Sequence, residues 1–180
     1  MLNRKLFFLV LFVMMYVCTL HAQIVQPASS DRHPWWVNLG GGGAFLGNDV
    51  TMTAGAIYSY QFESTIISAR IMGLTNENPT VQEIHATTVN YKFADYGILY
   101  GPIWHFGNGY VATTGGIGLV RAAYERPAGT STATSFSVPL EVQLGYRITS
   151  TVGIGLYPYA SINTEKSFWG MMACVQLGIW

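Results

Sequence analysis

Residues Ser135 to Ile148 read SFSVPLEVQLGYRI, and this stretch decides the fold. Extended as a strand, it has one face made of Phe136, Val138, Leu140, Val142, Leu144, Tyr146 and Ile148. The opposite face is made of Ser135, Ser137, Pro139, Glu141, Gln143, Gly145 and Arg147. An alternation with a period of two, and with no exception on the apolar side, predicts a β-strand between an apolar and a polar environment.

The same alternation recurs along the rest of the chain. It is weaker in the glycine-rich segment 35–46, and in segment 65–74 it places Arg70 opposite the apolar side chains. The fourth strand starts at residue 90, or starts as early as residue 83, or contains a bulge near Ala94, and a separate strand over 83–93 would give nine. Bacterial single-chain barrels have even strand numbers, which favours eight. We predict strands at 35–46, 51–62, 65–74, 90–106, 110–124, 135–148, 152–163 and 167–180.

The composition indicates a membrane environment. Half of the 180 residues are hydrophobic and a tenth are charged, whereas soluble domains average about a quarter charged residues. Beyond the N-terminal segment, no run of about 18 apolar residues could form a membrane-spanning helix. Because backbone polar groups in lipid must pair internally, a closed barrel remains. The sequence therefore predicts an all-β protein, an eight-stranded antiparallel up-and-down transmembrane β-barrel.

The N-terminal segment has the order of a signal peptide. Asn3-Arg4-Lys5 is followed by an apolar run from Leu6 to Val17 and by a small residue at Ala22. A lipoprotein anchor at Cys18 is the alternative, although Val17 is larger than the residue such an anchor prefers. We predict a signal peptide over 1–22, a periplasmic segment over 23–34 and the barrel over 35–180, in the outer membrane of a Gram-negative bacterium.

Removal of residues 1–22 changes the charge and cysteine content. Loss of Arg4 and Lys5 reduces nine basic residues to seven against nine acidic ones, a formal net charge of −2. No basic cluster remains to neutralise phosphates, so we expect no nucleic-acid partner. Cys174 is then the single cysteine, and one cysteine cannot form an internal disulfide.

The connections predict the orientation of the barrel. Outer-membrane barrels have short periplasmic turns and longer outer loops. With the N-terminus inside, the predicted periplasmic turns are Glu63-Ser64, Gly107-Asn108-Gly109 and Thr149-Ser150-Thr151. The predicted outer connections are Asn48-Asp49, 75–89, Glu125 to Thr134 and Asn163 to Lys166.

Charged and amide side chains on the inner faces predict a polar network in the lumen. A hairpin folded about Asn108 sets Phe106 opposite Tyr110 and Asp95 opposite Arg121, which predicts a cross-strand ion pair near the outer rim. Buried charges must be paired, so a structural role is favoured, with a ligand or proton site as the alternative. The predicted network consists of Arg70, Asp95, Arg121, Glu141, Gln143 and Arg147.

Aromatic residues gather at the predicted periplasmic strand ends. Such residues form girdles at the membrane–water interface of barrels. Stacking on sugars is the alternative. The predicted girdle consists of Trp35, Trp36, Trp104, Phe106, Tyr110, Tyr146 and Trp180.

Four short stretches in order carry a resemblance to a known family: Gly97-Ile-Leu-Tyr-Gly101, Gly116-Ile-Gly-Leu-Val-Arg121, Val138-Pro-Leu-Glu-Val-Gln-Leu144 and Lys166-Ser-Phe168. The chain resembles small, mostly uncharacterised bacterial outer-membrane β-barrel proteins. The resemblance implies the fold and location and brings no known active site. At the C-terminus the chain departs from the usual insertion signal, because Trp180 shares a face with Gly178 and Gln176 while Ile179 lies on the apolar side.

No catalytic or metal motif stands out. The three histidines beyond the signal peptide, His33, His85 and His105, lack the spacing of metal ligands. The glycines 40–43 lack the Lys-Ser/Thr of a phosphate loop. We therefore expect no cofactor and no enzyme activity.

Three functions remain open. The leading hypothesis is a barrel with a plugged polar lumen and a structural or interaction role at the cell surface. Its partners would be outer-membrane lipids and, during insertion, the barrel assembly machinery, with any protein partner unknown. A lipid A-modifying enzyme, acyl hydrolase or transferase, would need a Ser–His–acid arrangement, and His85 lies near Glu83, Thr87 and Thr88. A secreted soluble barrel that binds an apolar ligand would need the two faces reversed.

Overall fold

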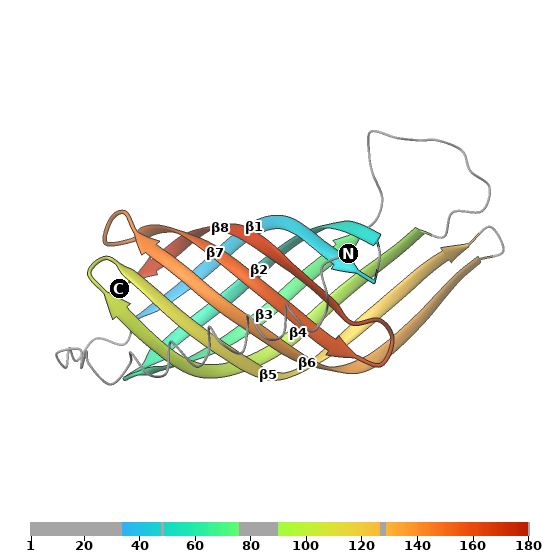
Figure 1. Cartoon of the computed structure of the whole chain (residues 1–180), viewed down its shortest axis with the longest axis horizontal. Helices are drawn as coiled ribbons and strands as arrows, with labels where there is room; N and C mark the ends of the chain where they lie inside the picture. Colours follow the sequence, from blue (N-terminus) through green and yellow to red (C-terminus); the bar gives the residue numbers. More distant parts are fainter. Residues whose placement is uncertain (1–33, 48, 76–89, 127–128, 180) are drawn as a thin grey trace. The chain divides into compact units, whose positions relative to one another are not determined.

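The computed structural model describes residues 34–47, 49–75, 90–126 and 129–179. The described chain forms eight antiparallel strands (Figure 1): β1 (Trp35–Leu46), β2 (Asp49–Phe62), β3 (Thr65–Thr75), β4 (Asn90–Phe106), β5 (Gly109–Arg126), β6 (Gly129–Arg147), β7 (Val152–Asn163) and β8 (Phe168–Ile179). The predicted signal peptide, residues 23–33 and the alternative strand start at 83 lie outside the described residues. Within the described ranges, no helix has the length and apolar character of a membrane span.

The sheet closes on itself. Each strand pairs with the next along the chain, and β1 pairs antiparallel with β8, from Trp35 opposite Ile179 to Leu46 opposite Phe168. The order is that of an up-and-down barrel, as the sequence predicted. We call the end that carries the β2–β3, β4–β5 and β6–β7 connections the turn end, and the opposite end the loop end.

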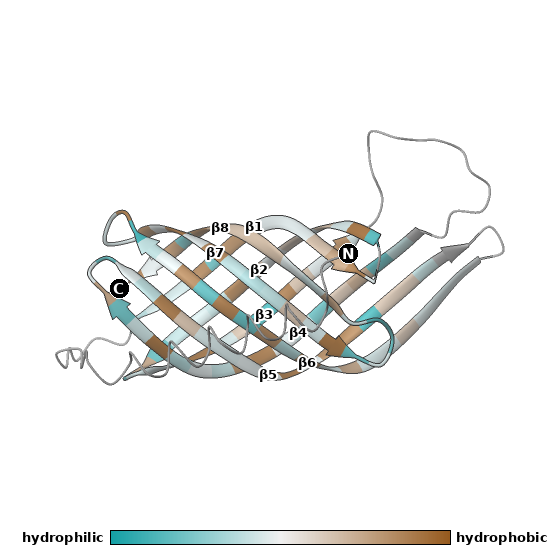
Figure 2. Cartoon of the chain, in the orientation of Figure 1, coloured by the Kyte–Doolittle hydropathy of each residue, from teal (hydrophilic) through white to brown (hydrophobic). Residues whose placement is uncertain are grey.

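The predicted alternation of faces is confirmed along the strands. On β6, Ser137, Glu141 and Gln143 are buried inside the barrel, while Phe136 and Val138 are exposed on its outer wall. On β8, Ile179 faces outward with Val175 and Leu177, which makes it the apolar residue at the strand end. Figure 2 shows hydrophobic and hydrophilic residues succeeding one another along the strands.

The predicted outer connection from Glu125 to Thr134 is wrong, because most of this stretch is strand. Pairing between β5 and β6 continues to Arg126 opposite Gly129. Threonines at 130, 132 and 134 favour an extended backbone. The strands β4, β5 and β6 have 17, 18 and 19 residues against 12 in β1, and they extend past the others in Figure 1. We call residues 90–94, 121–126 and 129–135 the projecting sheet.

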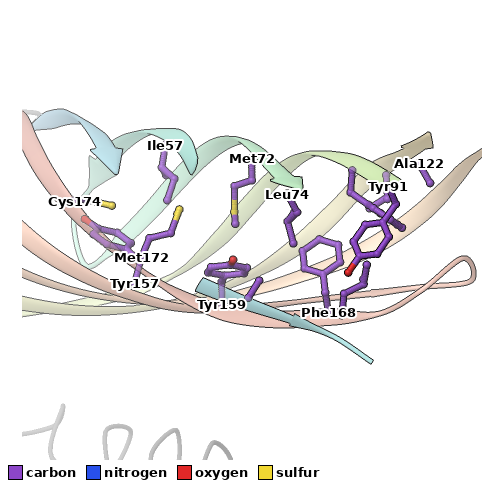
Figure 3. Close-up of a cluster of buried hydrophobic side chains, with 14 residues drawn as sticks. Ile57, Met72, Leu74, Tyr91, Ala122, Tyr157, Tyr159, Phe168, Met172 and Cys174 are labelled. Carbon is purple, nitrogen blue, oxygen red and sulfur yellow. The ribbon is translucent and has the colours of Figure 1, made fainter. Parts of the chain in front are cut away.

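The barrel interior contains many apolar side chains, whereas the sequence analysis predicted a polar lumen. Eight strands enclose a space just wide enough for side chains to fill. A continuous apolar column runs through this space toward the loop end (Figure 3). Its largest members are Leu46, Ile57, Met72, Leu74, Tyr91, Phe93, Tyr157, Tyr159, Phe168 and Met172. The interior therefore joins a polar layer to an apolar one.

One interior glycine gives a test of this packing. A Cβ at Gly145 would overlap the ring of Tyr110, whereas a Cβ at the outward Gly73 would meet its nearest neighbour, the Ala54 carbonyl oxygen, at 3.9 Å. Overpacking a filled interior costs about 1–3 kcal/mol. We expect Gly145→Ala to lower the free energy of unfolding by about that amount in urea titrations of the folded barrel. The matched control Gly73→Ala should stay near the parent, and equal stabilities would contradict the packed interior.

Candidate functional site

A buried arginine connects opposite sides of the barrel interior. The Arg70 Nη2 on β3 donates to Asp95 Oδ2 on the adjacent β4 at 2.6 Å. Its Nη1 lies 3.5 Å from Glu141 Oε2 on β6, across the lumen. All three side chains are fully buried. One guanidinium therefore holds two carboxylates together, and buried charges require such pairing.

Amide and hydroxyl groups extend this network. The Gln143 Nε2 donates to Glu141 Oε1 at 2.8 Å and lies 3.4 Å from Ser68 Oγ. The Ser59 and Ser68 hydroxyls are 2.8 Å apart. The structure thus brings four of the predicted polar residues together: Arg70, Asp95, Glu141 and Gln143. We call these four side chains the lumen network.

Arg121 is not part of the lumen network, and its predicted pair with Asp95 is wrong. Phe106 pairs with Gly109, and the register continues to Asp95 opposite Val120 and Ala94 opposite Arg121. The β4–β5 turn is one residue shorter than predicted, because Gly107 adopts a φ of +58° that suits a tight turn. A slip of one residue moves a side chain to the other face, so Arg121 is exposed on the outer wall.

Arg147 lies apart from the lumen network, at the turn end. Its Nη2 donates to the Gly107 carbonyl oxygen at 3.0 Å, and its side chain is partly exposed. This hydrogen bond joins the end of β6 to the β4–β5 turn. Arg147 was predicted in the polar network of the lumen, but in the structure its side chain stabilises a turn.

Two predicted girdle residues are instead inside the barrel. Trp36 and Tyr110 are 0% and 1% exposed, and their ring centroids are 5.2 Å apart. The Tyr110 hydroxyl lies 3.1 Å from the Tyr157 hydroxyl, and Gln176 Nε2 donates to it at 2.6 Å. These side chains lie together in the interior at the turn end. Placing Trp36 and Tyr110 in a membrane-facing girdle was wrong, because both point inward.

The remaining girdle candidates lie at the turn end with different exposures. Trp35, Phe106 and Tyr146 are exposed on the outer wall, and Trp104 is half-buried. Trp35 stacks near Tyr58 with a centroid distance of 6.3 Å. Trp180 lies outside the described residues. Their role as a girdle remains a prediction.

The residues considered for catalysis are only partly described. His105 Nε2 lies 2.9 Å from Gln61 Oε1 at the turn end. The Gln61 side chain therefore gives the His105 ring a hydrogen-bond partner. Within the described residues, no group of three histidine, cysteine or acidic side chains could hold a metal ion. The candidates Glu83, His85, Thr87 and Thr88, like His33, lie outside the described part of the chain.

The loop end has a feature that the sequence analysis missed, an open sheet edge. Residues 129–136 of β6 pair with β5, but pairing of β6 with β7 begins only at Ser137 opposite Asn163. Among the described strands, this stretch of β6 therefore has a neighbour on one side only. Threonine at every second position from 130 to 134 was a signal for strand in the sequence.

Removing the charge of Arg70 should destabilise the barrel strongly. Arg70→Met leaves Asp95 and Glu141 buried without their cation, a change that costs about 3–5 kcal/mol. The triple variant Arg70→Met/Asp95→Asn/Glu141→Gln should recover most of that loss. Urea unfolding of the detergent-folded protein measures both. Arg147→Met is the control and should cost less than about 1 kcal/mol. A single variant as stable as the parent would contradict the structural role of the lumen network.

Comparison with known proteins supports the fold. No family model matches the chain, and no curated protein matches it in sequence. Among solved structures, Neisserial surface protein A matches with a TM-score of 0.63 and 11% identity, over 81% of this chain and 96% of its own. Ail, the attachment invasion locus protein of Yersinia pestis, matches with a TM-score of 0.58 and 10% identity, over 82% and 97%.

A third match is the N-terminal β-barrel domain of Pseudomonas aeruginosa OprF, with a TM-score of 0.54 and 11% identity, over 82% of this chain and 100% of its own. Identities this low establish the fold alone. The chain has the fold of small eight-stranded bacterial outer-membrane β-barrel proteins.

Proposed function

We propose that this protein is an outer-membrane β-barrel that anchors itself by its apolar wall and presents the projecting sheet for interactions at the cell surface. The height of the apolar wall carries the proposal. On β6, every outward residue from Tyr146 to Phe136 is apolar, and the outward residues beyond are threonines. Ten residues of strand, about 3.4 Å each and tilted by about 40°, span roughly 25 Å of height. This equals the apolar band of membrane barrels.

The outer limit of this wall is sharp on two neighbouring strands, β5 and β6. Tyr96, Leu119 and Phe136 pair in one row across β4, β5 and β6, and all three are exposed. The next row toward the loop end consists of Ala94, Arg121 and Thr134. A change from apolar to polar within one row suits the boundary between acyl chains and headgroups. Because short turns are periplasmic in such barrels, we assign the loop end to the cell exterior.

The projecting sheet supports a role in interactions. Its outer strand, residues 129–135, belongs to the open edge described above and contains neither lysine nor proline, two residues that proteins use to protect such edges. An extended polypeptide could add to this edge through backbone hydrogen bonds. The similarity to Ail, whose name refers to attachment, is consistent with this role.

The two alternatives have less support. A soluble barrel with an apolar ligand needs a polar outer wall, but among the outward strand positions whose side-chain exposure the structure describes, only Lys92 and Arg121 are charged. A lipid A-modifying enzyme would depend on His85 and its neighbours, and no observation on the described residues favours it.

Single cysteines test the location and orientation. In a Cys174→Ala background, we expect Thr130→Cys at the loop end to react with a membrane-impermeant maleimide on intact Gram-negative cells. The matched variant Ser150→Cys at the turn end should react only after the outer membrane is opened. The labelled protein should fractionate with the outer membrane and migrate differently on SDS gels before and after boiling. Reaction of Ser150→Cys on intact cells would overturn the orientation, and a periplasmic protein without a gel shift would overturn membrane anchoring.

Shortening the projecting sheet tests the interaction role. Residues 122–133 are replaced by Asn-Gly, which forms a two-residue hairpin between the paired residues Arg121 and Thr134. The barrel should keep its heat-dependent gel shift. Attachment of expressing cells to a cultured cell monolayer should fall to the level of cells without the protein. Attachment equal to that of the parent would exclude the projecting sheet as the binding element.

A further inference from the structure

The short connection between β7 and β8 is closely hydrogen-bonded within itself. The Lys166 amide donates to Asn163 Oδ1 at 2.8 Å, and Asn163 Nδ2 donates to the Lys166 carbonyl oxygen at 3.2 Å. The Ser167 hydroxyl donates to the Asn163 carbonyl oxygen at 3.2 Å. Asparagine and serine side chains that bond to a nearby main chain fix a tight turn. This turn therefore sets the direction in which the Lys166 side chain leaves the connection.

The Lys166 side chain extends from this turn across the loop end of the barrel. Its Nζ donates to Asp49 Oδ2 at 3.2 Å, at the start of β2, and lies 5.4 Å from the centroid of the Tyr91 ring on β4. It passes Gly47, where an added Cβ would be 3.2 Å from Lys166 Cε. Because β4 and β8 are four strands apart in a closed ring of eight, they lie on opposite sides of the barrel. One lysine thus joins the β7–β8 connection to the opposite wall.

The tyrosine beneath Lys166 belongs to the apolar column. Tyr91 is buried, and its ring packs edge-on against Phe93 with a centroid distance of 5.8 Å. Phe93 also contacts Phe168, the first residue of β8, at 6.4 Å. Burial and the neighbouring Asp49 carboxylate raise the pKa of Tyr91 to about 12. The Lys166–Asp49 pair therefore lies over the aromatic end of the apolar column.

The connection also comes close to β5. Burial and the charge of Glu165 raise the pKa of Tyr124, whose ring contacts Phe93 at 5.9 Å. The β7–β8 connection is therefore near the start of β2 and near rings on β4 and β5. We propose that Lys166 is a latch: its contacts with Asp49 and Tyr91 hold the β7–β8 connection over the loop end of the barrel, and their release exposes the aromatic end of the apolar column to small molecules.

Two features make this contact releasable. The Lys166 and Asp49 side chains are 38% and 54% exposed, so the pair is weak and is screened by salt, unlike the fully buried pair of Arg70 and Asp95. Pairing between β7 and β8 ends at Ser161 opposite Phe168, and among the described strands residues 164–167 have no ladder partner. The connection can therefore lift away without breaking the hydrogen bonds of the sheet, and such segments open at low free energy.

Thiol labelling of the detergent-folded protein measures the opening. In a Cys18→Ala/Cys174→Ala background, Ala122→Cys puts a thiol at the aromatic end of the apolar column (Figure 3), and Ala44→Cys gives a second probe on β1. Both alanines are fully buried. The reagent is N-ethylmaleimide, which is small and uncharged. With the latch intact, we expect both thiols to react much more slowly than in protein unfolded by urea.

Loss of the latch should speed this labelling. An exposed ion pair shifts an equilibrium by up to about fivefold, so Asp49→Asn should raise the labelling rate by about that factor. Lys166→Met should raise it further, because it also loses the contact with the Tyr91 ring. The double variant should match Lys166→Met, since both changes act on one contact. Lys166→Arg keeps the cation and should label slowly. Raising the salt from about 0.05 M to about 1 M should speed labelling with the latch intact but not in Asp49→Asn.

Two controls separate the latch from a general loosening of the barrel. Glu63→Gln removes one acidic charge at the turn end and should leave the labelling rates unchanged. In a Cys18→Ala background, Cys174, at the far end of the apolar column (Figure 3), should stay slow to react in all latch variants. Equal rates with and without Asp49→Asn and Lys166→Met would overturn the latch. An equal acceleration in Glu63→Gln, or at Cys174, would also overturn it. The labelling needs no membrane, so its result does not depend on the proposed function.

Discussion

The pairing of β1 with β8 is the constraint on which the rest of the structure depends. Once the sheet closes, each strand position faces either the interior or the outer wall. Alternation within each strand then decides which side chains must pack together inside. The lumen network and the apolar column follow from this, because both consist of inward positions from strands that are distant in sequence.

Alternation within a strand is visible in the sequence, but the relation between strands depends on the turns. The faces of residues 135–148 were predictable because a period of two leaves no choice once one face is assigned. The Asp95–Arg121 pair failed because it required the length of the β4–β5 turn, and Gly107 allows a turn one residue shorter. The girdle prediction failed at Trp36 for a different reason: Trp35 and Trp36 are consecutive in one strand, so alternation does not allow both to face lipid.

The interior shows what sequence patterns leave out. Arg70, Asp95, Glu141 and Gln143 were predictable as inward polar residues, because a charge on the apolar face of a strand would break the alternation. Their partners were not, since contact across the lumen depends on the stagger of strands around the barrel. The apolar column was harder still to predict. The sequence alone does not show whether an apolar residue such as Met72 or Phe93 faces lipid or packs inside the barrel.

Height and face together explain the different fates of Arg70 and Arg121. A charge on the lipid face costs about 2–4 kcal/mol at the middle of the bilayer and about 0–1 near its surface. Arg70 belongs to the middle of the wall and faces inward, where two carboxylates compensate its burial. Arg121 faces outward, but only beyond the row of Tyr96, Leu119 and Phe136. On our proposal that the apolar wall spans the membrane, the β4–β5 turn, which is one residue shorter than predicted, therefore directs Arg121 outward at a height where a charge costs little stability.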